Sequence, residues 1–261
     1  MKLADPTTHK DWLPPHSFAW YAQLEALTGE YAYPWHSTTA GRDGEQIFDK
    51  EVAELVPGQR VLDIGCGDGA YTISWSPSVK SIVGLDVTPG FIETGNAHKL
   101  ANVSFVAAST KAALPFANGE FDCAYNRKGP TSAYPDLSRV VRQGGLILGL
   151  HPGDHRLGEL AGLIPTLFKA VIPAERPVLD KLESQLAGGN FAQSSVDLVT
   201  HLEYLHQPLD VIRLSCFGQT SAVHEMMISE VLPAVEQHFR EHATPSGLAV
   251  SNEYYIVRIT V

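Results

Sequence analysis

The chain has 261 residues, a formal net charge of −10, 44% hydrophobic residues and 18% charged residues. This length and composition fit one globular α/β domain with additions, and they exclude a disordered chain. The acidic balance argues against a nucleic-acid partner, because proteins that bind nucleic acid usually carry a basic face that neutralises phosphates.

The three cysteines are isolated, and the C-x-x-C spacing of a zinc module does not occur. The first residues lack the basic and then apolar pattern of a secretory signal, and no apolar run approaches the roughly 20 residues that span a bilayer. We therefore expect a cytoplasmic protein with reduced thiols and no membrane anchor.

Residues 1–44 are expected to form an N-terminal arm or lid. Apolar residues recur at helical spacing from Phe18 to Leu27 after a Ser17 cap, and the turn-like composition of 31–44 predicts a segment that arches over the edge of a ligand site. Packing and a substrate cage are both open interpretations of its aromatic residues. These are Trp12, Phe18, Trp20, Tyr21, Tyr31, Tyr33 and Trp35.

A helix that ends before Pro57 and Gly58 is predicted, because Phe48, Val52 and Leu55 form an apolar stripe. The stretch VLDIGCGDG at residues 61–69 follows it and is the most informative part of the chain. Residues 61–64 predict a buried strand, and the three alternate glycines allow a tight turn and a close approach to a ligand.

The glycine loop leads into a predicted helix that begins at Ala70, and free N–H groups at a helix start suit a carboxylate or a phosphate. A second apolar run, residues 82–85, ends in Asp86, whose carboxylate is placed to accept hydrogen bonds from a ribose diol. Together these features predict a site for a nucleoside cofactor.

The loop also satisfies the loose dinucleotide fingerprint G-x-G-x-x-G/A, so NAD remains an alternative. Asp63 argues against it, because a carboxylate two residues before the first glycine would repel a pyrophosphate but can bind an ammonium. S-adenosylmethionine (SAM) carries an ammonium, a carboxylate and a ribose, and no phosphate. The D-x-G-x-G-x-G loop resembles that of the class I SAM-dependent methyltransferases.

The resemblance continues through a helix that begins at Thr88-Pro89, a strand over 103–106, the segment Leu114-Pro115-Phe116 and a fourth strand over 121–126. Where that family usually has an acid that binds adenine, this chain has Ser109 and Thr110, whose hydroxyl groups would bind more weakly. A glycine pair at 144–145 and a fifth strand that ends at His151 follow.

The second half predicts helices near 157–164 and 179–186, a strand over 195–206, helices over 209–216 and 224–242, and a last strand over 254–261. The resemblance implies a Rossmann-like sheet of seven strands flanked by helices, with the last strand antiparallel. Its domains would be the arm 1–44 and a methyltransferase domain 45–261, which contains a helical cap insertion at 152–194.

Catalytic candidates must lie at the carboxyl ends of the strands, where open α/β sheets bind ligands. Methyl transfer needs mainly alignment, and a base only if the acceptor loses a proton. We assign His151 as the candidate base, with Asn126 and His36 as further catalytic candidates. A purely structural role remains an alternative for each of these residues. A metal site formed by His151, Asp154 and His155 is also left open. The expected cofactor contacts are Asp63, Gly65, Cys66, Gly67, Gly69, Asp86, Val87, Ser109, Thr110, Asn126 and Arg127.

A narrower resemblance concerns residues 127–160, whose segment HPGDHRLGEL is similar to one in the 23S ribosomal RNA guanine-N1 methyltransferases, although this chain lacks their four-cysteine zinc module. The acidic charge does not suit ribosomal RNA. We therefore predict a SAM-dependent methyltransferase, a monomer or homodimer, that acts on a small molecule. An RNA or protein methyltransferase, or a SAM-binding protein without catalysis, are the alternatives.

Overall fold

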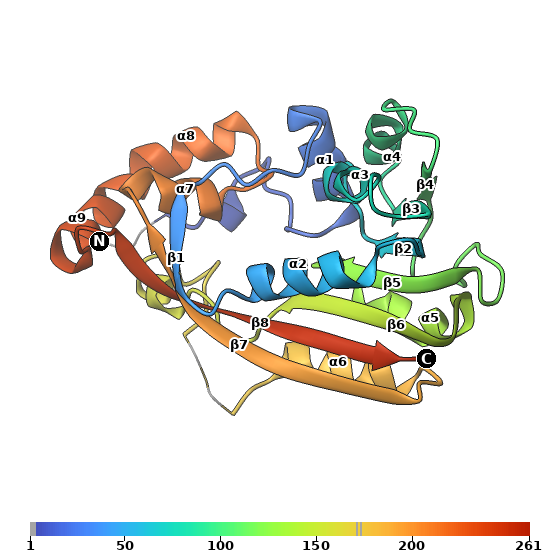
Figure 1. Ribbon diagram of the computed structural model, residues 1–261. Coiled ribbons are helices and arrows are strands. Elements are labelled where there is room, and N and C mark those ends of the chain that lie inside the picture. The colour runs from blue at the N-terminus through green and yellow to red at the C-terminus, as the bar shows by residue number, and fades with distance from the viewer. Residues whose placement is uncertain (1–3, 171, 173) are drawn as a thin grey trace. The chain divides into compact units, whose positions relative to one another are not determined.

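The two strands predicted around the glycine loop are neighbours in one mixed sheet (Figure 1). The computed structural model describes residues 4–170, 172 and 174–261. The strand order is β1-β7-β8-β6-β5-β2-β3-β4. The strands are β1 (Ser37–Gly41), β2 (Arg60–Ile64), β3 (Ser81–Asp86), β4 (Val103–Ala107), β5 (Phe121–Arg127), β6 (Val141–Pro152), β7 (Gln193–Leu205) and β8 (Leu248–Thr260).

One side of the sheet, from β6 to the edge strand β4, is parallel. Strand β2 pairs in parallel with β3 on one side and with β5 on the other, and β5 pairs in parallel with β6. The last strand, β8, pairs antiparallel with β6, from Leu146 opposite Thr260 to Pro152 opposite Tyr254. This order confirms the predicted α/β sheet with an inserted antiparallel strand, and it brings the carboxyl ends of β2, β3 and β5 to one edge.

The prediction of seven strands was wrong by one, because residues 37–41 form β1. This strand pairs antiparallel with the second half of β7, from Ser37 opposite Leu205 to Gly41 opposite His201. Its sequence, STTAG, has no apolar alternation and is mostly exposed, so its strand conformation comes from pairing with a distant segment.

Helices precede or connect most of these strands. They are α1 (Phe18–Thr28), α2 (Gly44–Leu55), α3 (Ala70–Ser74), α4 (Pro89–Asn96), α5 (Tyr134–Val140), α6 (Pro177–Ala187), α7 (Pro208–Ser215), α8 (Ser221–Glu230) and α9 (Leu232–His242), with the short 3-10 helices η1 (Pro6–Thr8), η2 (Thr131–Ala133) and η3 (Gly158–Gly162).

Two helix predictions need correction. The helix predicted near 157–164 is the short 3-10 helix η3. The residue before it, Leu157, has a left-handed backbone conformation (φ 56°). The helix predicted over 224–242 is two helices, α8 and α9, separated at Val231. Pro233 explains the break, because it has no N–H to donate to the preceding turn.

The chain divides into two compact units. Unit 1 comprises Met1–Asp43, His155–Ala174 and Thr200–Asn252, and unit 2 comprises Gly44–Asp154, Glu175–Val199 and Glu253–Val261. The cap insertion predicted at 152–194 is thus shared between the two units. Its interpretation as a cap, like that of residues 1–44 as a lid, stays a prediction.

Unit 2 buries apolar residues on both faces of the sheet. Helix α2 packs Phe48 and Val52 on one face, in a cluster that includes Val61 of β2. Helices α5 and α6 cover the other face, where Leu62 of β2 is buried, and Figure 1 shows these helices on the opposite side from α2. Successive residues of β2 therefore face opposite layers, and burial of an apolar side chain such as Phe48 stabilises this packing by about 1.5–3 kcal/mol.

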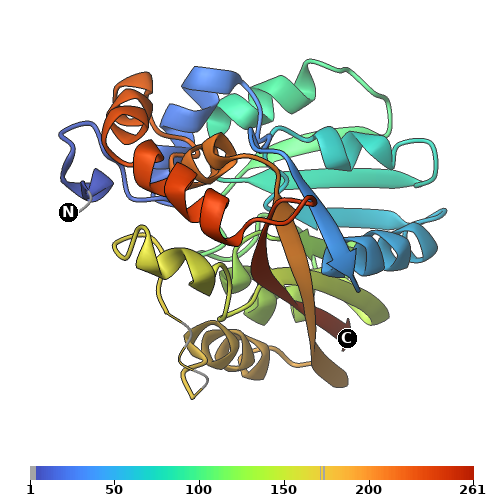
Figure 2. The same cartoon turned by 90° about the vertical axis from the view of Figure 1, so that its left-hand side faces the viewer.

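Unit 1 has a separate core. Helices α7, α8 and α9 contact one another, and Figure 2 shows them side by side. Val211 of α7, Met227 of α8 and Val235 of α9 are fully buried in this core.

None of the helices within the described residues is long and apolar enough to cross a membrane.

Candidate functional site

The loop between β2 and α3 requires its glycines. Gly65, Gly67 and Gly69 have φ values of 73°, 55° and 84°, a left-handed backbone that side chains disfavour. A Cβ atom added at Gly65 would lie 2.8 Å from the Cα of Gly129, and one at Gly69 would lie 2.4 Å from the Phe105 ring. The glycine spacing noted in the sequence is therefore a requirement of this backbone.

Asp86, at the end of β3, links this loop to the start of α4. Its Oδ2 accepts a hydrogen bond from the Gly67 N–H at 3.1 Å, and its Oδ1 accepts one from the Thr88 N–H at 2.9 Å. Carboxylate oxygens have further lone pairs, so these bonds leave acceptor capacity for a ribose hydroxyl. The structure brings Asp86 and the predicted glycine loop together.

The residues after Asp86 fit a nucleoside. Val87 is 40% exposed, an apolar surface of the kind on which a base can lie. The Thr88 hydroxyl is buried and has no hydrogen-bond partner among the described residues. Thr88 is the N-cap residue of α4, and a hydroxyl at this position often accepts a hydrogen bond from a backbone N–H of the first turn, but this one does not. An orphaned hydroxyl is costly to bury, so it marks a place where a ligand could supply the partner.

Asp63 lies buried beneath the loop, 2% exposed. Its Oδ2 accepts hydrogen bonds from the Thr72 hydroxyl at 2.6 Å and the Tyr125 hydroxyl at 2.9 Å. Burial raises the pKa of Asp63 to about 7, and these two hydrogen bonds offset it only in part. A cation next to this carboxylate would stabilise its charged form, and the ammonium of SAM is such a cation.

The other predicted cofactor contacts lie nearby in unit 2. Burial raises the pKa of the Cys66 thiol, so this cysteine is a neutral side chain at neutral pH. Ser109 is exposed, and Thr110 is buried with its hydroxyl 2.7 Å from that of Ser132. Their contact with adenine stays a prediction.

Asn126, at the end of β5, is fully buried. Its Nδ2 donates to the Pro130 carbonyl at 3.0 Å, and its Oδ1 has no partner among the described residues. A Cβ atom at Gly129 would lie 2.7 Å from that Oδ1 and 2.4 Å from the Ile64 carbonyl oxygen, so this glycine permits the turn to approach β2 closely. Asn126 therefore holds the turn against the glycine loop, and its contact with cofactor or acceptor stays a prediction.

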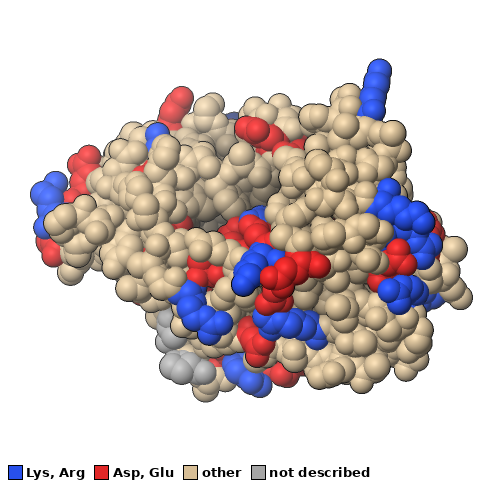
Figure 3. All heavy atoms as spheres, in the orientation of Figure 1, with Lys and Arg blue, Asp and Glu red and all other residues tan. Residues whose placement is uncertain are grey.

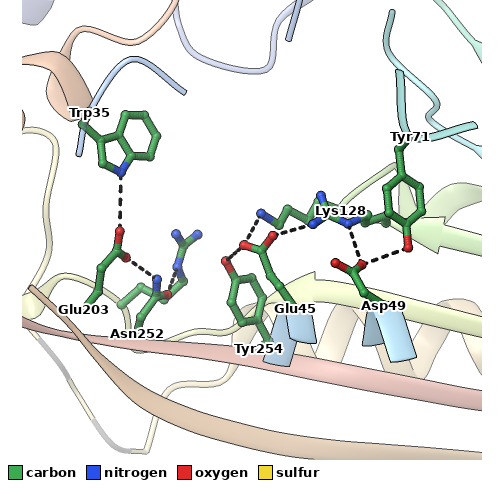
Figure 4. A network of polar contacts seen from close by, with 10 residues as sticks. Trp35, Glu45, Asp49, Tyr71, Lys128, Glu203, Asn252 and Tyr254 are labelled. Carbon is green, nitrogen blue, oxygen red and sulfur yellow. Dashed lines mark hydrogen bonds and ion pairs between the residues drawn. The ribbon is translucent and has the colours of Figure 1, made fainter. Parts of the chain in front are cut away.

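Arg127 and Lys128 form a network with helix α2. The Arg127 guanidinium donates to Asp49 Oδ1 at 3.1 Å and Glu45 Oε2 at 2.7 Å, and it lies over the Tyr71 ring at 4.8 Å from the centroid. Lys128 also donates to Glu45. Figure 4 shows Lys128 and Glu45 pointing toward one another.

Two tyrosines complete this network. Tyr71 donates to Asp49 Oδ1 at 2.9 Å, and Tyr254 of β8 donates to Glu45 Oε1 at 2.7 Å (Figure 4). Burial by itself would raise the pKa of Glu45, but Lys128 and Arg127 outweigh it and lower that pKa to about 2. Glu45 is therefore charged at neutral pH, and it orders the segment that follows β5.

Four residues of this network were not predicted from the sequence: Glu45, Asp49, Tyr71 and Tyr254. One signal was present for the first two: they are four residues apart on a predicted helix, so they share a face. Their partners could not be identified, because Arg127 lies about 80 positions further along the chain.

His151 is buried at the end of β6, and its Nε2 lies 2.7 Å from the Tyr134 hydroxyl. Burial lowers the pKa of His151 to about 3, so this ring is a weak base in the unliganded protein. The neighbouring candidate Asp154 accepts hydrogen bonds from the N–H groups of Val178 and Leu179, and it caps α6. Catalysis by His151 stays a prediction, and the structure adds a structural role through Tyr134.

His36 belongs to unit 1. Its backbone N–H donates to Asp210 Oδ1 at 3.2 Å, and its ring Nδ1 lies 3.6 Å from the same oxygen. His155, also in unit 1, has its Nε2 3.1 Å from the Ile172 carbonyl oxygen. The catalytic assignment of His36 stays a prediction.

The segment that carries the glycine loop is similar to known proteins. A family model described as a methyltransferase domain matches residues 61–145. An uncharacterized methyltransferase from Synechocystis sp. is 31% identical over 143 residues, which cover 48% of this chain and 66% of that protein. A demethylmenaquinone methyltransferase from Renibacterium salmoninarum is 31% identical over 125 residues, with coverage of 46% and 52%. The chain thus spans between about half and two thirds of these relatives' length.

Solved structures share the fold. A functionally unknown protein from Deinococcus radiodurans R1 has a TM-score of 0.61 at 20% identity, over 94% of this chain and 99% of that one. A [4+2]-cyclase has a TM-score of 0.54 at 15% identity, over 93% of this chain and 94% of that one. Because this fold also occurs in a cyclase, it does not by itself identify a reaction.

The family match covers the glycine loop, Asp86 and Asn126 at the end of β5, and it stops before His151. The narrower resemblance to ribosomal RNA methyltransferases is not shown. Residues 61–145 are therefore similar to a class I SAM-dependent methyltransferase domain, and SAM is the methyl donor that this family uses.

Proposed function

We propose that this chain transfers a methyl group from SAM to a small-molecule acceptor by in-line displacement. One observation carries the proposal: a buried carboxylate, Asp63, with a pKa of about 7, lies beneath a loop whose three glycines have positive φ values. The geometry suits a ligand with a positive amino-acid moiety, and a pyrophosphate would be repelled there.

When bound, SAM supplies an activated methyl group on a sulfonium, which is a good leaving group. The residues of unit 2 would then bind and orient it. Asp63 would hold the ammonium, Asp86 would accept from the ribose hydroxyls, and Val87 would contact the adenine. The glycine loop lets the backbone approach without a Cβ in the way. Alignment of the acceptor and exclusion of water supply the rate enhancement that this chemistry needs.

Charge supports a small acceptor. The chain has a formal net charge of −10, and Figure 3 shows Lys and Arg lying beside Asp and Glu on the face displayed. Arginines of unit 2 are engaged in such pairs, as Arg60 is with Asp122 at 3.0 Å. Cationic side chains that are already neutralised contribute little to binding a phosphate backbone. The relative named as a demethylmenaquinone methyltransferase also acts, by its name, on a small molecule.

The proposed catalytic residues are His151, Asn126 and His36. Asn126 has the strongest support, because its buried Oδ1 has no partner among the described residues and a buried acceptor of this kind favours a donor on a ligand. His151 would act as a base only if the bound acceptor or a local opening raised its pKa.

Calorimetry with SAM and with NADH tests the cofactor assignment. We expect saturable binding of SAM and none of NADH, and binding of NADH alone would overturn the proposal. A Gly67→Val variant is the matched negative control, because the added side chain strains a residue with φ 55° and fills space next to the loop.

Transfer of radiolabelled methyl from SAM then tests the reaction. Acceptor fractions from a cell extract are separated into small molecules, protein and RNA, and we expect label in the small-molecule fraction. Label in RNA, with binding that weakens steeply as salt rises, would support the RNA alternative instead. SAM binding without transfer to any fraction would favour a SAM-binding protein, or a reaction of another class on the same fold.

A further inference from the structure

Four aromatic side chains of unit 1 form a cluster that we name the aromatic panel: Tyr31, Tyr33, Trp35 and Phe217. The Phe217 ring centroid lies 5.4 Å from that of Tyr31, 5.3 Å from that of Tyr33 and 5.8 Å from that of Trp35, each nearly edge-on. Tyr33 and Trp35 stack at 4.6 Å. The panel thus joins three alternate residues of one segment to a residue about 180 positions further along.

Helix α1 holds Phe217 in place. The Trp20 indole N–H donates to the Phe217 carbonyl at 3.0 Å, and Gln23 Nε2 donates to the Gly218 carbonyl at 2.8 Å. Gly218 has a φ of 71°, and a Cβ atom there would lie 2.5 Å from the Trp20 ring. This turn is therefore packed tightly against α1, and the packing fixes the position of Phe217.

The panel is incompletely buried. Tyr33 is 44% exposed, and Tyr31, Trp35 and Phe217 are half-buried, whereas Trp20 behind them is 1% exposed. A single exposed ring is ordinary on a protein surface, but several adjoining rings that retain exposure are typical of a binding surface. Packing thus accounts for the buried Trp20, whereas the panel keeps part of its ring surface exposed to solvent.

A carboxylate lies next to the panel. The Trp35 indole N–H points at Glu203 Oε1 at 3.4 Å, and Asn252 Nδ2 donates to Glu203 Oε2 at 2.8 Å, as Figure 4 shows. Both donors are uncharged. Arg156 donates to Asn252 Oδ1 at 2.7 Å. Acidic residues also outnumber basic ones in the described part of unit 1.

We propose that the aromatic panel and Glu203 bind an organic ammonium cation. Aromatic faces attract a cation through the negative charge of their π-systems, and a nearby carboxylate adds direct attraction. The carboxylate of Glu203 would repel an anionic ligand. A neutral planar ligand could stack on the rings, but the charge of Glu203 would not strengthen its binding. This site goes beyond the proposed methyl transfer, and it rests on residues of unit 1 alone.

The test uses choline and its uncharged carbon isostere, 3,3-dimethylbutan-1-ol, without SAM. The four tryptophans are labelled with ¹⁵N, and the indole N–H signal of Trp35 is identified by its loss in a Trp35→Phe variant. We expect choline to shift this signal saturably, and the isostere to bind at least about tenfold more weakly. Equal binding of the two compounds, or no shift of the Trp35 signal, would overturn the proposal.

Two variants and one control locate the site. Glu203→Gln keeps the hydrogen-bond acceptor and removes the charge, and Tyr33→Leu removes a ring. Each should weaken choline binding at least about fivefold. Glu230→Gln, at an exposed carboxylate at the end of α8, should leave it unchanged. Retention of wild-type affinity by Glu203→Gln would refute the role of the carboxylate.

The Trp20 indole signal serves as a folding control, because Trp20 is buried behind the panel. It should be unchanged in Glu203→Gln, which would show that the panel is intact. Calorimetry of the wild type and of the same variants with SAM separates the two proposals. If the wild-type protein did not bind SAM, the proposed function would be refuted and the choline result would remain valid.

Discussion

Replacing Asp63 with asparagine should stabilise the unliganded protein at alkaline pH and weaken its binding of SAM. Asparagine has nearly the same shape, and its Oδ1 can still accept from the Thr72 and Tyr125 hydroxyls that bond to the carboxylate. The substitution therefore removes mainly the cost of a buried charge. In the unfolded chain the carboxyl regains its ordinary pKa of 3.8, whereas burial raises its pKa to about 7 in the folded protein.

The sign follows from proton binding. Between pH 3.8 and about 7 the folded protein holds a proton on Asp63 that the unfolded chain has lost, so the wild-type free energy of unfolding falls as the pH rises through this range and levels off above it. Each pH unit contributes about 1.4 kcal/mol. Between pH 5 and pH 8 the wild type should lose about 3 kcal/mol through this group, and Asp63→Asn should not.

Urea unfolding of both proteins at several pH values between 5 and 8 measures this difference. Asp122→Asn is the control, because hydrogen bonding to Arg60 lowers the pKa of Asp122, and this residue is ionised in both states throughout the range. Its stability loss should not change with pH. The reasoning would be refuted if the difference between Asp63→Asn and the wild type were equally independent of pH.

The remaining predictions concern the loop, the end of β3 and His151. Asp86→Ala should weaken SAM binding by about 1.5–3 kcal/mol in calorimetry, through loss of charge-assisted hydrogen bonds, and unchanged affinity would contradict the assignment. Gly69→Ala should destabilise the protein by at least about 1–2 kcal/mol in urea unfolding, because its φ is 84° and the new Cβ meets the Phe105 ring; a variant of wild-type stability would show that the ring moves aside. His151→Ala should cost about 1–3 kcal/mol by leaving the Tyr134 hydroxyl buried without its partner, and a lower turnover with SAM affinity retained would add a base role. A variant with stability and turnover both unchanged would exclude each role.

The binding of SAM should itself depend on pH. If the ammonium of SAM lies beside Asp63, binding favours the charged carboxylate, so affinity should decrease as the pH falls below about 7. Asp63→Asn should bind more weakly and lose this dependence. Calorimetry over pH 6 to 8 measures both, and a wild-type affinity that does not change would place the ammonium elsewhere.

The local parts of the site could be predicted from sequence. The glycines at 65, 67 and 69 adopt positive φ values, and Asp86 ends its strand beside them, because these features depend on residues close together in the chain. The same holds for the buried parallel strands, which read as continuous apolar runs. The division of 224–242 into two helices was missed although Pro233 marks it.

Contacts between distant segments could not be predicted in this way. Strand β1 exists because Ser37–Gly41 pairs with the end of β7, and its own composition does not favour a strand. The interaction of Arg127 and Lys128 with Glu45 likewise depends on α2 packing near the end of β5.

By itself, the sequence determined which backbone can turn at residues 65–69 and which strands are apolar enough to be buried, because these properties depend on local conformation and periodicity. Only the tertiary structure decided that Asp63 is shielded from water, that His151 faces Tyr134, and that Phe217 meets the aromatic residues of the N-terminal segment. Burial and electrostatic environment depend on everything that surrounds a side chain, and residues far apart in the sequence supply most of those surroundings.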